Sequence, residues 1–364
     1  MRPTFASVDL SSIAHNFHLL QRLSGRRVLA VVKADAYGHG AARVARALEA
    51  AGADFFCVAI AEEGVALRRA GIRSPILLLN SCGGGEAPLY RALALTPTLF
   101  SVDQARDFAA ATAAFSRPLA VHVKLDTGLT RLGVMPEEIP ALAEVLRRAP
   151  GLRVEAAFTH FSHGDEPESP ELASQEERSK SAFAALRAAG LQPDWTHLAN
   201  SGAAMAGKGA WTDAVRPGLS LYGVSPAAGL GSELRPALSW ETEVVAVKRV
   251  ASGTPVGYGG AFVTTRESIL AVLAIGYDDG YRRSFGGKVP VLFAGGAART
   301  VGVISMDLTV CDTTDLEVRR GDRTVLLGAT PAGAVSAHDL ARAAETIPYE
   351  ILCGIGARVP RRYS

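Results

Sequence analysis

One lysine of the 364-residue sequence stands where an amine could carry out covalent chemistry. Lys33 directly follows the apolar run Val28–Val32, which is typical of a buried strand. Partial removal of an ammonium group from water favours the neutral amine, which is the form that attacks an aldehyde. Lysine is also scarce, since only six of the 38 basic residues are lysine. A single lysine at a strand end is usually a surface residue, so Lys33 needs companions before it indicates a site.

Such companions follow four later apolar runs. They are Lys124, Arg131, His160, Asn200, Ser201 and Arg216. The pairs Ser201-Gly202 and Gly218-Leu219 could offer backbone amides to a phosphate group. A lysine, two arginines, a histidine and an anion-binding turn suit a phosphorylated aldehyde, and the sequence therefore favours pyridoxal 5'-phosphate (PLP) as cofactor.

The elements that would position these groups alternate between strands and helices. Eight short apolar runs begin near residues 28, 55, 76, 98, 119, 154, 196 and 214. Between them, Ala41–Ala51 has the helical spacing of Val44 and Leu48, Ser101-x-x-Gln104 is typical of a capping box, and a helix is expected over Glu137–Arg148. This alternation predicts a parallel (β/α)₈ barrel, in which reactive groups gather at the carboxyl ends of the strands.

The pattern changes after Arg235-Pro236. A barrel uses roughly 250 residues or fewer, so more than a hundred residues remain for a second domain. In that part, strands are expected over 243–250, 269–275, 289–293, 300–304 and 324–327, with one clear helix over 336–346. We therefore predict a barrel over residues 1–234, whose first residues could pair with the other domain, and a mostly antiparallel β-domain over 235–364.

Composition excludes several classes of protein. The chain is 48% hydrophobic and 20% charged with a mean hydropathy of +0.16, which excludes a disordered or collagen-like protein. A net charge of +2 offers no attraction to nucleic acid or anionic membranes. There is no C-x-x-C pair among Cys57, Cys82, Cys311 and Cys353. The first residues, from Met1 and Arg2 onward, lack the apolar core of a signal peptide. No apolar run is long enough to span a bilayer. A cytoplasmic protein is expected.

Two other patterns carry less weight. His160-x-x-His163 with Asp165 could bind a metal, but no third histidine or HExxH frame accompanies it, so no metal is expected. The glycines of 82–85 and 253–260 do not form a dinucleotide-binding fingerprint after a strand.

The segment Val32–Gly40 resembles the PLP-attachment signature of alanine racemases. The resemblance covers nearly the whole chain and continues through Lys124–Gly133, Thr159–Phe161, Ala199–Ser201, Val215–Tyr222, Gly257–Gly259, Ile275–Gly280, Ser305–Asp307, Ile347–Glu350 and Arg358–Arg361. It implies a homodimeric, PLP-dependent racemase that interconverts L- and D-alanine and supplies D-alanine for peptidoglycan. In such a dimer each active site is shared between the subunits.

The resemblance also implies roles for individual residues. Racemisation removes a proton from one face of the α-carbon and returns one to the other, so two bases are expected. Lys33 would bind PLP, and Lys33 and Tyr258 would act on opposite faces of the aldimine. The other residues implied in cofactor binding are Tyr37, His160, Asn200, Ser201, Arg216, Gly218, Leu219 and Tyr349. Arg131, Met306 and Tyr277 would contact the substrate or line its entry, and Lys124 matches a lysine that is often carbamylated.

Departures from the family pattern are small. Ser305 and Pro348 stand where some members have Cys and Asn. Three alternatives remain open: a serine or broad-specificity racemase of the same fold, a PLP-dependent decarboxylase with the same two domains, and a non-catalytic PLP-binding barrel. Barrels of the last kind lack the β-domain, and Tyr258 also counts against it.

Overall fold

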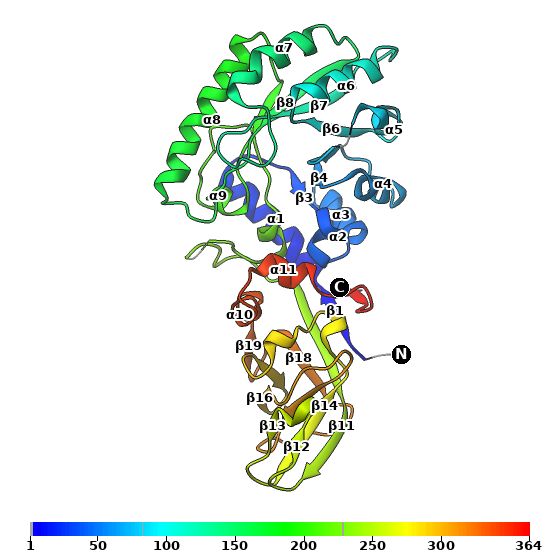
Figure 1. Ribbon diagram of the computed structural model, residues 1–364, viewed down its shortest axis with the longest axis vertical. Coiled ribbons are helices and arrows are strands. Elements are labelled where there is room, and N and C mark those ends of the chain that lie inside the picture. Colours follow the sequence, from blue (N-terminus) through cyan, green and yellow to red (C-terminus); the bar gives the residue numbers. More distant parts are fainter. Residues whose placement is uncertain (1–2, 82, 228) are drawn as a thin grey trace. The chain divides into compact units, whose positions relative to one another are not determined.

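Residues 3–81, 83–227 and 229–364 are described by the computed structural model, and they divide into two units (Figure 1). Ser12–Arg235 form one unit, and the segment up to Ser11 joins Pro236–Ser364 in the other. Of the residues used in the sequence analysis, Met1, Arg2 and Cys82 lie outside the described ranges.

The first unit is a parallel barrel, as the eight apolar runs predict. Its strands follow the order β2-β10-β9-β8-β7-β6-β5-β4-β3, and every pairing in this sheet is parallel. β2 and β3 are separated only by Leu29, so they are two halves of one strand and the sheet closes on itself. The barrel strands are β2 (Arg27–Val28), β3 (Ala30–Val31), β4 (Phe56–Val58), β5 (Ile76–Leu78), β6 (Leu95–Leu99), β7 (Leu119–Lys124), β8 (Leu152–Phe158), β9 (Trp195–His197) and β10 (Ala214–Val215).

One helix precedes the first of these strands and the others follow or connect the strands, and several of them lie outside the strands in Figure 1. They are α1 (Leu10–Ser24), α2 (Lys33–Gly38), α3 (Ala41–Ala50), α4 (Ala61–Arg69), α5 (Ala87–Ala92), α6 (Val102–Thr112), α7 (Ile139–Arg147), α8 (Pro170–Ala188) and α9 (Ser201–Met205). α3 buries Val44 and Leu48 on one face, as their spacing predicts.

The expected capping box at the start of α6 is only half formed. Ser101 Oγ accepts a hydrogen bond from the amide of Gln104, but the Gln104 side chain accepts from the amide of Phe100 and not from that of Ser101. The helix expected from Glu137 begins at Ile139, because a 3₁₀ turn, η2 (Pro136–Glu138), precedes it.

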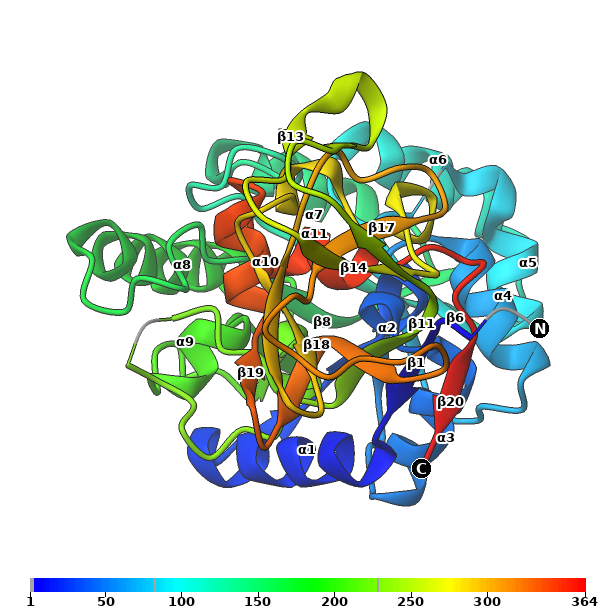
Figure 2. The same ribbon diagram turned by 90° about the horizontal axis from the view of Figure 1, so that it is seen from below.

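The second unit is a mostly antiparallel β-domain. Its sheet follows the order β19-β18-β15-β16-β17-β14-β11-β1-β20, and β18 also pairs with β11, so the strands from β18 to β11 form a closed ring. β1 pairs with β11 on one side and with β20, in parallel, on the other (Figure 2). The strands are β1 (Phe5–Val8), β11 (Leu238–Val250), β12 (Pro255–Val256), β13 (Phe262–Val263), β14 (Ser268–Leu273), β15 (Pro290–Phe293), β16 (Gly296–Thr300), β17 (Thr309–Asp312), β18 (Arg323–Thr330), β19 (Gly333–Val335) and β20 (Arg361–Tyr363).

Two expectations for this unit are wrong. The strand expected over 300–304 does not form, because β16 ends at Thr300 and the chain then makes a loop as far as β17. The described residues of this unit also form two helices instead of one, α10 (Ala337–Ala343) and α11 (Pro348–Cys353), together with the 3₁₀ turns η4 (Tyr258–Gly260), η5 (Tyr277–Asp279) and η6 (Arg283–Phe285).

Within the described parts of the chain, no helix combines the length and the apolar character that crossing a membrane requires.

Candidate active site

The barrel brings together the polar groups that follow its strands. Lys33 follows β3, Lys124 ends β7, His160 lies two residues after β8, and Arg216 directly follows β10. Asn200 and Ser201 begin α9 after β9, and Gly218 and Leu219 begin the 3₁₀ turn η3 (Leu219–Tyr222). Because the strands are parallel, these positions share one end of the barrel, which is where enzymes of this architecture place their active sites.

A left-handed turn follows Lys33. Ala34, Asp35, Ala36 and Tyr37 have φ between 51° and 55° and ψ between 41° and 51°. This conformation costs L-residues roughly 1–2 kcal/mol each. The turn is held at both ends, since the amide of Ala34 donates to Glu63 Oε1 and Asp35 Oδ1 accepts from the amide of Ala41. Strain kept in place by its surroundings is typical of a functional segment.

A cradle for an anion lies between Tyr37, Ser201 and Gly218. Ser201 Oγ accepts hydrogen bonds from the amides of Gly218 and Ser220, at 2.9 and 3.3 Å. A β-carbon on residue 218 would overlap the Tyr37 hydroxyl and would lie 2.8 Å from Tyr37 Cζ, so only glycine admits this approach. The cradle fits the phosphate of PLP. Asn200 directly precedes Ser201, and its side chain caps α9 by accepting a hydrogen bond from the amide of Ala203.

Arg216 is buried at the centre of this end of the barrel. Its Nη1 lies 2.5 Å from His197 Nδ1, and its Nη2 contacts the carbonyls of Thr159 and Leu198 and His160 Nδ1, at 2.6, 3.0 and 3.2 Å. None of these hydrogen bonds uses Nε. Within the described ranges Arg216 forms no ion pair with a carboxylate, and burial lowers its pKa to about 10. A fixed donor of this kind suits the pyridine nitrogen of PLP.

Four cationic side chains lie close enough together here to lower the pKa of their neighbours. Burial and the charges of Arg216, Lys124, Arg131 and Lys33 lower the pKa of His160 well below its ordinary value, so its imidazole is neutral. Burial, followed by the charges of Arg131 and Arg216, lowers the pKa of Lys124 to about 8. The positive field suits two anions, the phosphate of PLP and the carboxylate of an amino acid.

Arg131 lies on a loop that Asp126 organises. Asp126 Oδ1 accepts from the amides of Gly128, Leu129 and Thr130, and Oδ2 accepts from the amide of Arg131 itself. The buried carboxylate therefore fixes the backbone from which the exposed Arg131 side chain extends. Sequence reasoning missed this role of Asp126.

The remaining predicted residues belong to the β-domain. Tyr258 is 75% exposed, Met306 50% and Tyr277 42%. Tyr349 is half-buried in the first turn of α11. All three side chains are therefore accessible from outside this unit.

Two loops of the β-domain that carry Tyr277 and Met306 are bound to each other. The amide of Tyr277 donates to the carbonyl of Ser305 at 3.0 Å, and that of Asp278 to the carbonyl of Met306 at 3.2 Å. A β-carbon on Gly276 would overlap both of these carbonyl oxygens, so glycine lets the loops approach.

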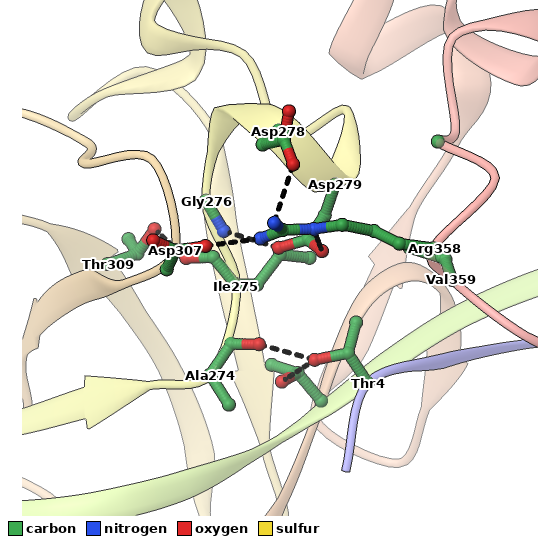
Figure 3. A network of polar contacts seen from close by, with 12 residues as sticks. Thr4, Ala274, Ile275, Gly276, Asp278, Asp279, Asp307, Thr309, Arg358 and Val359 are labelled. Carbon is green, nitrogen blue, oxygen red and sulfur yellow. Dashed lines mark hydrogen bonds and ion pairs between the residues drawn. The ribbon is translucent and has the colours of Figure 1, made fainter. Parts of the chain in front are cut away.

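Arg358 joins the same two loops through three carboxylates (Figure 3). Its guanidinium contacts Asp278 at 2.5 Å and Asp279 at 2.8 Å on η5, and Asp307 at 2.5 Å beside Met306. Asp279 is fully buried, and its other oxygen accepts from the amide of Gly276. Arg358 was part of a recognised motif, but its contacts arise from tertiary packing that the sequence does not reveal.

The metal alternative finds no support in the described residues, where no group of three or more His, Cys, Asp or Glu side chains is arranged to hold an ion. His163 instead contacts Ser162 Oγ through Nδ1, at 2.9 Å.

Comparisons with known proteins agree across both units. The family model for the alanine racemase N-terminal domain matches residues 8–226, and that for the C-terminal domain matches residues 237–363. The alanine racemase of Symbiobacterium thermophilum is 42% identical over 367 residues, covering 100% of this chain and 97% of that protein.

Solved structures give the same result. The alanine racemase of a D-cycloserine-producing Streptomyces lavendulae has a TM-score of 0.94 and 35% identity, with 100% of this chain and 97% of that one covered. The alanine racemase of Bartonella henselae, described with covalently bound pyridoxal phosphate, has a TM-score of 0.91 and 30% identity and is covered completely, as is this chain.

Proposed function

The chain belongs to the alanine racemase family, and from this premise we propose which of its residues carry the reaction. It is a PLP-dependent enzyme that interconverts L- and D-alanine. The observation that carries the residue assignment is the cradle of Tyr37, Ser201 and Gly218 beside a strand-end lysine, because phosphate and aldehyde of one cofactor could then be held together.

Lys33 is the residue that binds PLP covalently, and Tyr37, Ser201 and the amides of Gly218 and Leu219 hold its phosphate. The family resemblance assigns Tyr349 to the same set. When bound, PLP supplies an electron sink that acidifies the α-C–H bond of the amino acid attached to it.

Arg216 and His160 are the residues that would lie against the ring of the cofactor. Arginine keeps its protons, so Arg216 would leave the pyridine nitrogen unprotonated and would limit how much negative charge the ring withdraws. His160 accepts a hydrogen bond from Arg216 on Nδ1, so its neutral form carries the proton on Nε2. Asn200 contributes by capping the helix that begins at Ser201.

Two side chains move the proton. Lys33 would hold or accept it on its Nζ at one face of the α-carbon, and Tyr258 would do so on its Oη at the opposite face. Arg131 binds the substrate carboxylate, with Asp126 fixing the loop beneath it. Carbamate formation would change the side chain of Lys124 itself from a cation into an anion, which could then orient Arg131.

We assign Tyr258, Tyr277 and Met306 to the active site of a partner subunit in a homodimer. Their exposure on the β-domain supports this assignment, since it leaves the three side chains accessible to a second subunit. The family resemblance further supports a cytoplasmic enzyme that supplies D-alanine for peptidoglycan. Its partners would then be a small amino acid and a second copy of the chain.

The test is racemisation by the purified, PLP-loaded protein. We expect chiral chromatography to show D-alanine forming from L-alanine, and more slowly, if at all, D-serine or D-lysine from the L-amino acids supplied in parallel. A Lys33→Ala variant serves as the control and should lose both bound PLP and activity. Equal rates with L-serine would indicate a broad substrate range instead of a preference for alanine. PLP binding without turnover would indicate a non-catalytic PLP-binding protein.

A further inference from the structure

Two buried histidines occupy the interior of the barrel, a space that branched aliphatic side chains usually fill. His122 in β7 and His197 in β9 are both fully buried. Phe158 stacks on the His197 ring at 4.5 Å between centroids, and Trp195 meets the His122 ring edge-on at 4.9 Å. Because a buried polar ring costs free energy unless its nitrogens are hydrogen-bonded, the partners of these nitrogens identify what the pair does.

The four ring nitrogens form a continuous chain of hydrogen bonds. Arg216 Nη1 lies 2.5 Å from His197 Nδ1, and His197 Nε2 lies 3.0 Å from His122 Nδ1. His122 Nε2 lies 3.3 Å from Glu155 Oε2 in β8. The chain therefore connects Arg216, at the active-site end, with a carboxylate deeper along the barrel.

The direction of every bond in this chain is fixed by its two ends. A guanidinium can only donate, so His197 Nδ1 accepts from Arg216 and the proton of neutral His197 is on Nε2. That proton is donated to His122 Nδ1, so His122 also carries its proton on Nε2. The last proton is donated to Glu155, because an ionised carboxylate can only accept.

The protonation states agree with this direction. Burial and the nearby charge of Arg216 lower the pKa of His197 well below its ordinary value, and burial also lowers that of His122. The hydrogen bond from His122 lowers the pKa of Glu155, which keeps the carboxylate ionised. The other charges near the pair are Arg27, from β2, and Arg153, in β8.

We propose that Glu155 is a positioning residue of the racemase reaction, which sets the tautomers of His122 and His197 and thereby holds Arg216 in place for the cofactor ring. This role rests on the assignment of Arg216 in the proposed function. Without an acceptor at residue 155, His122 could carry its proton on Nδ1 and donate to His197 Nε2. His197 would then present an N–H to the N–H of Arg216, and the guanidinium would have to move.

A surface ion pair is the simpler role for Glu155, and the geometry separates the two. Arg153 contacts Oε1 at 3.2 Å and Asp194 at 2.5 Å, with half of its side chain exposed. His122 uses the other oxygen, Oε2. Replacing Arg153 therefore removes the ion pair without removing the acceptor of His122, which gives a matched control.

The first experiment reads the tautomers directly in protein labelled with ¹⁵N-histidine and freed of PLP. Two-bond ¹⁵N–¹H correlation spectra should show His122 and His197 protonated on Nε2 in the wild type, in Arg153→Leu and in Glu155→Gln, whose amide oxygen still accepts. In Glu155→Leu, signals of the Nδ1–H form should appear. Nδ1–H forms in the wild type, or an unchanged spectrum in Glu155→Leu, would overturn the proposal.

The second experiment measures alanine racemisation by the PLP-loaded variants. Because a small misplacement at a reacting centre costs up to about a hundredfold in rate, we expect kcat of Glu155→Leu to fall by about ten- to a hundredfold, with a smaller change in KM. Arg153→Leu should keep the wild-type kcat, and Glu155→Gln should keep most of it. Equal kcat in Glu155→Leu and Arg153→Leu would overturn the positioning role.

The two experiments separate the two proposals. If the wild type fails to racemise alanine, the proposed function fails, while the tautomer spectra still test the hydrogen-bond chain. If Glu155→Leu does not fold, the wild-type and Glu155→Gln spectra still test the proposed tautomers, because both must show each histidine protonated on Nε2.

Discussion

The hydroxyl of Tyr37 occupies the space that a β-carbon on residue 218 would need. Gly218→Ala should therefore displace the buried Tyr37 ring and distort the phosphate cradle. Overpacking costs about 1–3 kcal/mol, so the Kd of PLP should rise by about 5- to 150-fold. Fluorescence titration of the PLP-free protein measures this. Gly85→Ala, at a glycine with open space around it, is the control and should bind PLP normally.

Tyr258→Phe should impair the two directions of proton exchange unequally. The variant keeps the ring but loses the hydroxyl that serves one face of the α-carbon, and loss of a general base costs about 10²–10⁴-fold. We expect loss of α-proton exchange into D₂O with L-alanine, while D-alanine, which Lys33 serves, provides the internal control. Equal losses for both enantiomers would show that the two residues do not act on separate faces.

Lys124 should take up CO₂ in a pH-dependent way. Carbamate formation consumes the neutral amine, and with a pKa of about 8 roughly half of Lys124 is neutral at pH 8, against less than about 1% for an ordinary lysine. The modification should therefore increase as pH rises through 8 and disappear at lower pH. A carbamate signal in ¹³C NMR after addition of ¹³C-bicarbonate would show it. The same signal in Lys124→Met would assign it to another lysine.

Replacement of Arg358 should loosen the loops that carry Tyr277 and Met306. In Arg358→Met, three carboxylates that now share one cation would repel one another, and buried Asp279 would lose its ion pair. We expect the Tm to fall by several degrees and the amides of 276–279 to exchange faster with D₂O. Arg249→Met, which breaks the exposed pair with Glu267, is the control. A similar Tm in both variants would contradict a special role for Arg358.

Much of the fold was predictable because hydrophobic periodicity reports directly on burial. All eight strand positions of the barrel were found in this way, although the first strand is interrupted at Leu29. The strand expected over 300–304 failed because an apolar run fits a loop equally well when that loop is bound by others. Here the carbonyls of Ser305 and Met306 accept hydrogen bonds from the amides of another loop. α11 was missed because six residues are too few to show a helical period.

For the candidate site, the residues at strand ends could be identified but their supports could not. His122 and Glu155 reach the site through hydrogen bonds that depend on how neighbouring strands are paired, and one sequence does not show that register. Asp126 acts locally, through the amides of residues 128–131, in a loop that has no periodic pattern. No residue type in the sequence indicates the left-handed turn after Lys33 either, because residues 34–37 include no glycine.

That turn has a consequence for the order of folding. Four consecutive L-residues in a left-handed conformation gain nothing from local preference, so the contacts around Ala36 and Tyr37 must stabilise the turn. It can form only after the strands beside it have assembled, and it should open before they do. The segment that we assign to cofactor binding is thus expected to be a late and separable unit of folding, with amides that exchange in native-state experiments at a lower free energy than those of β3 and β4.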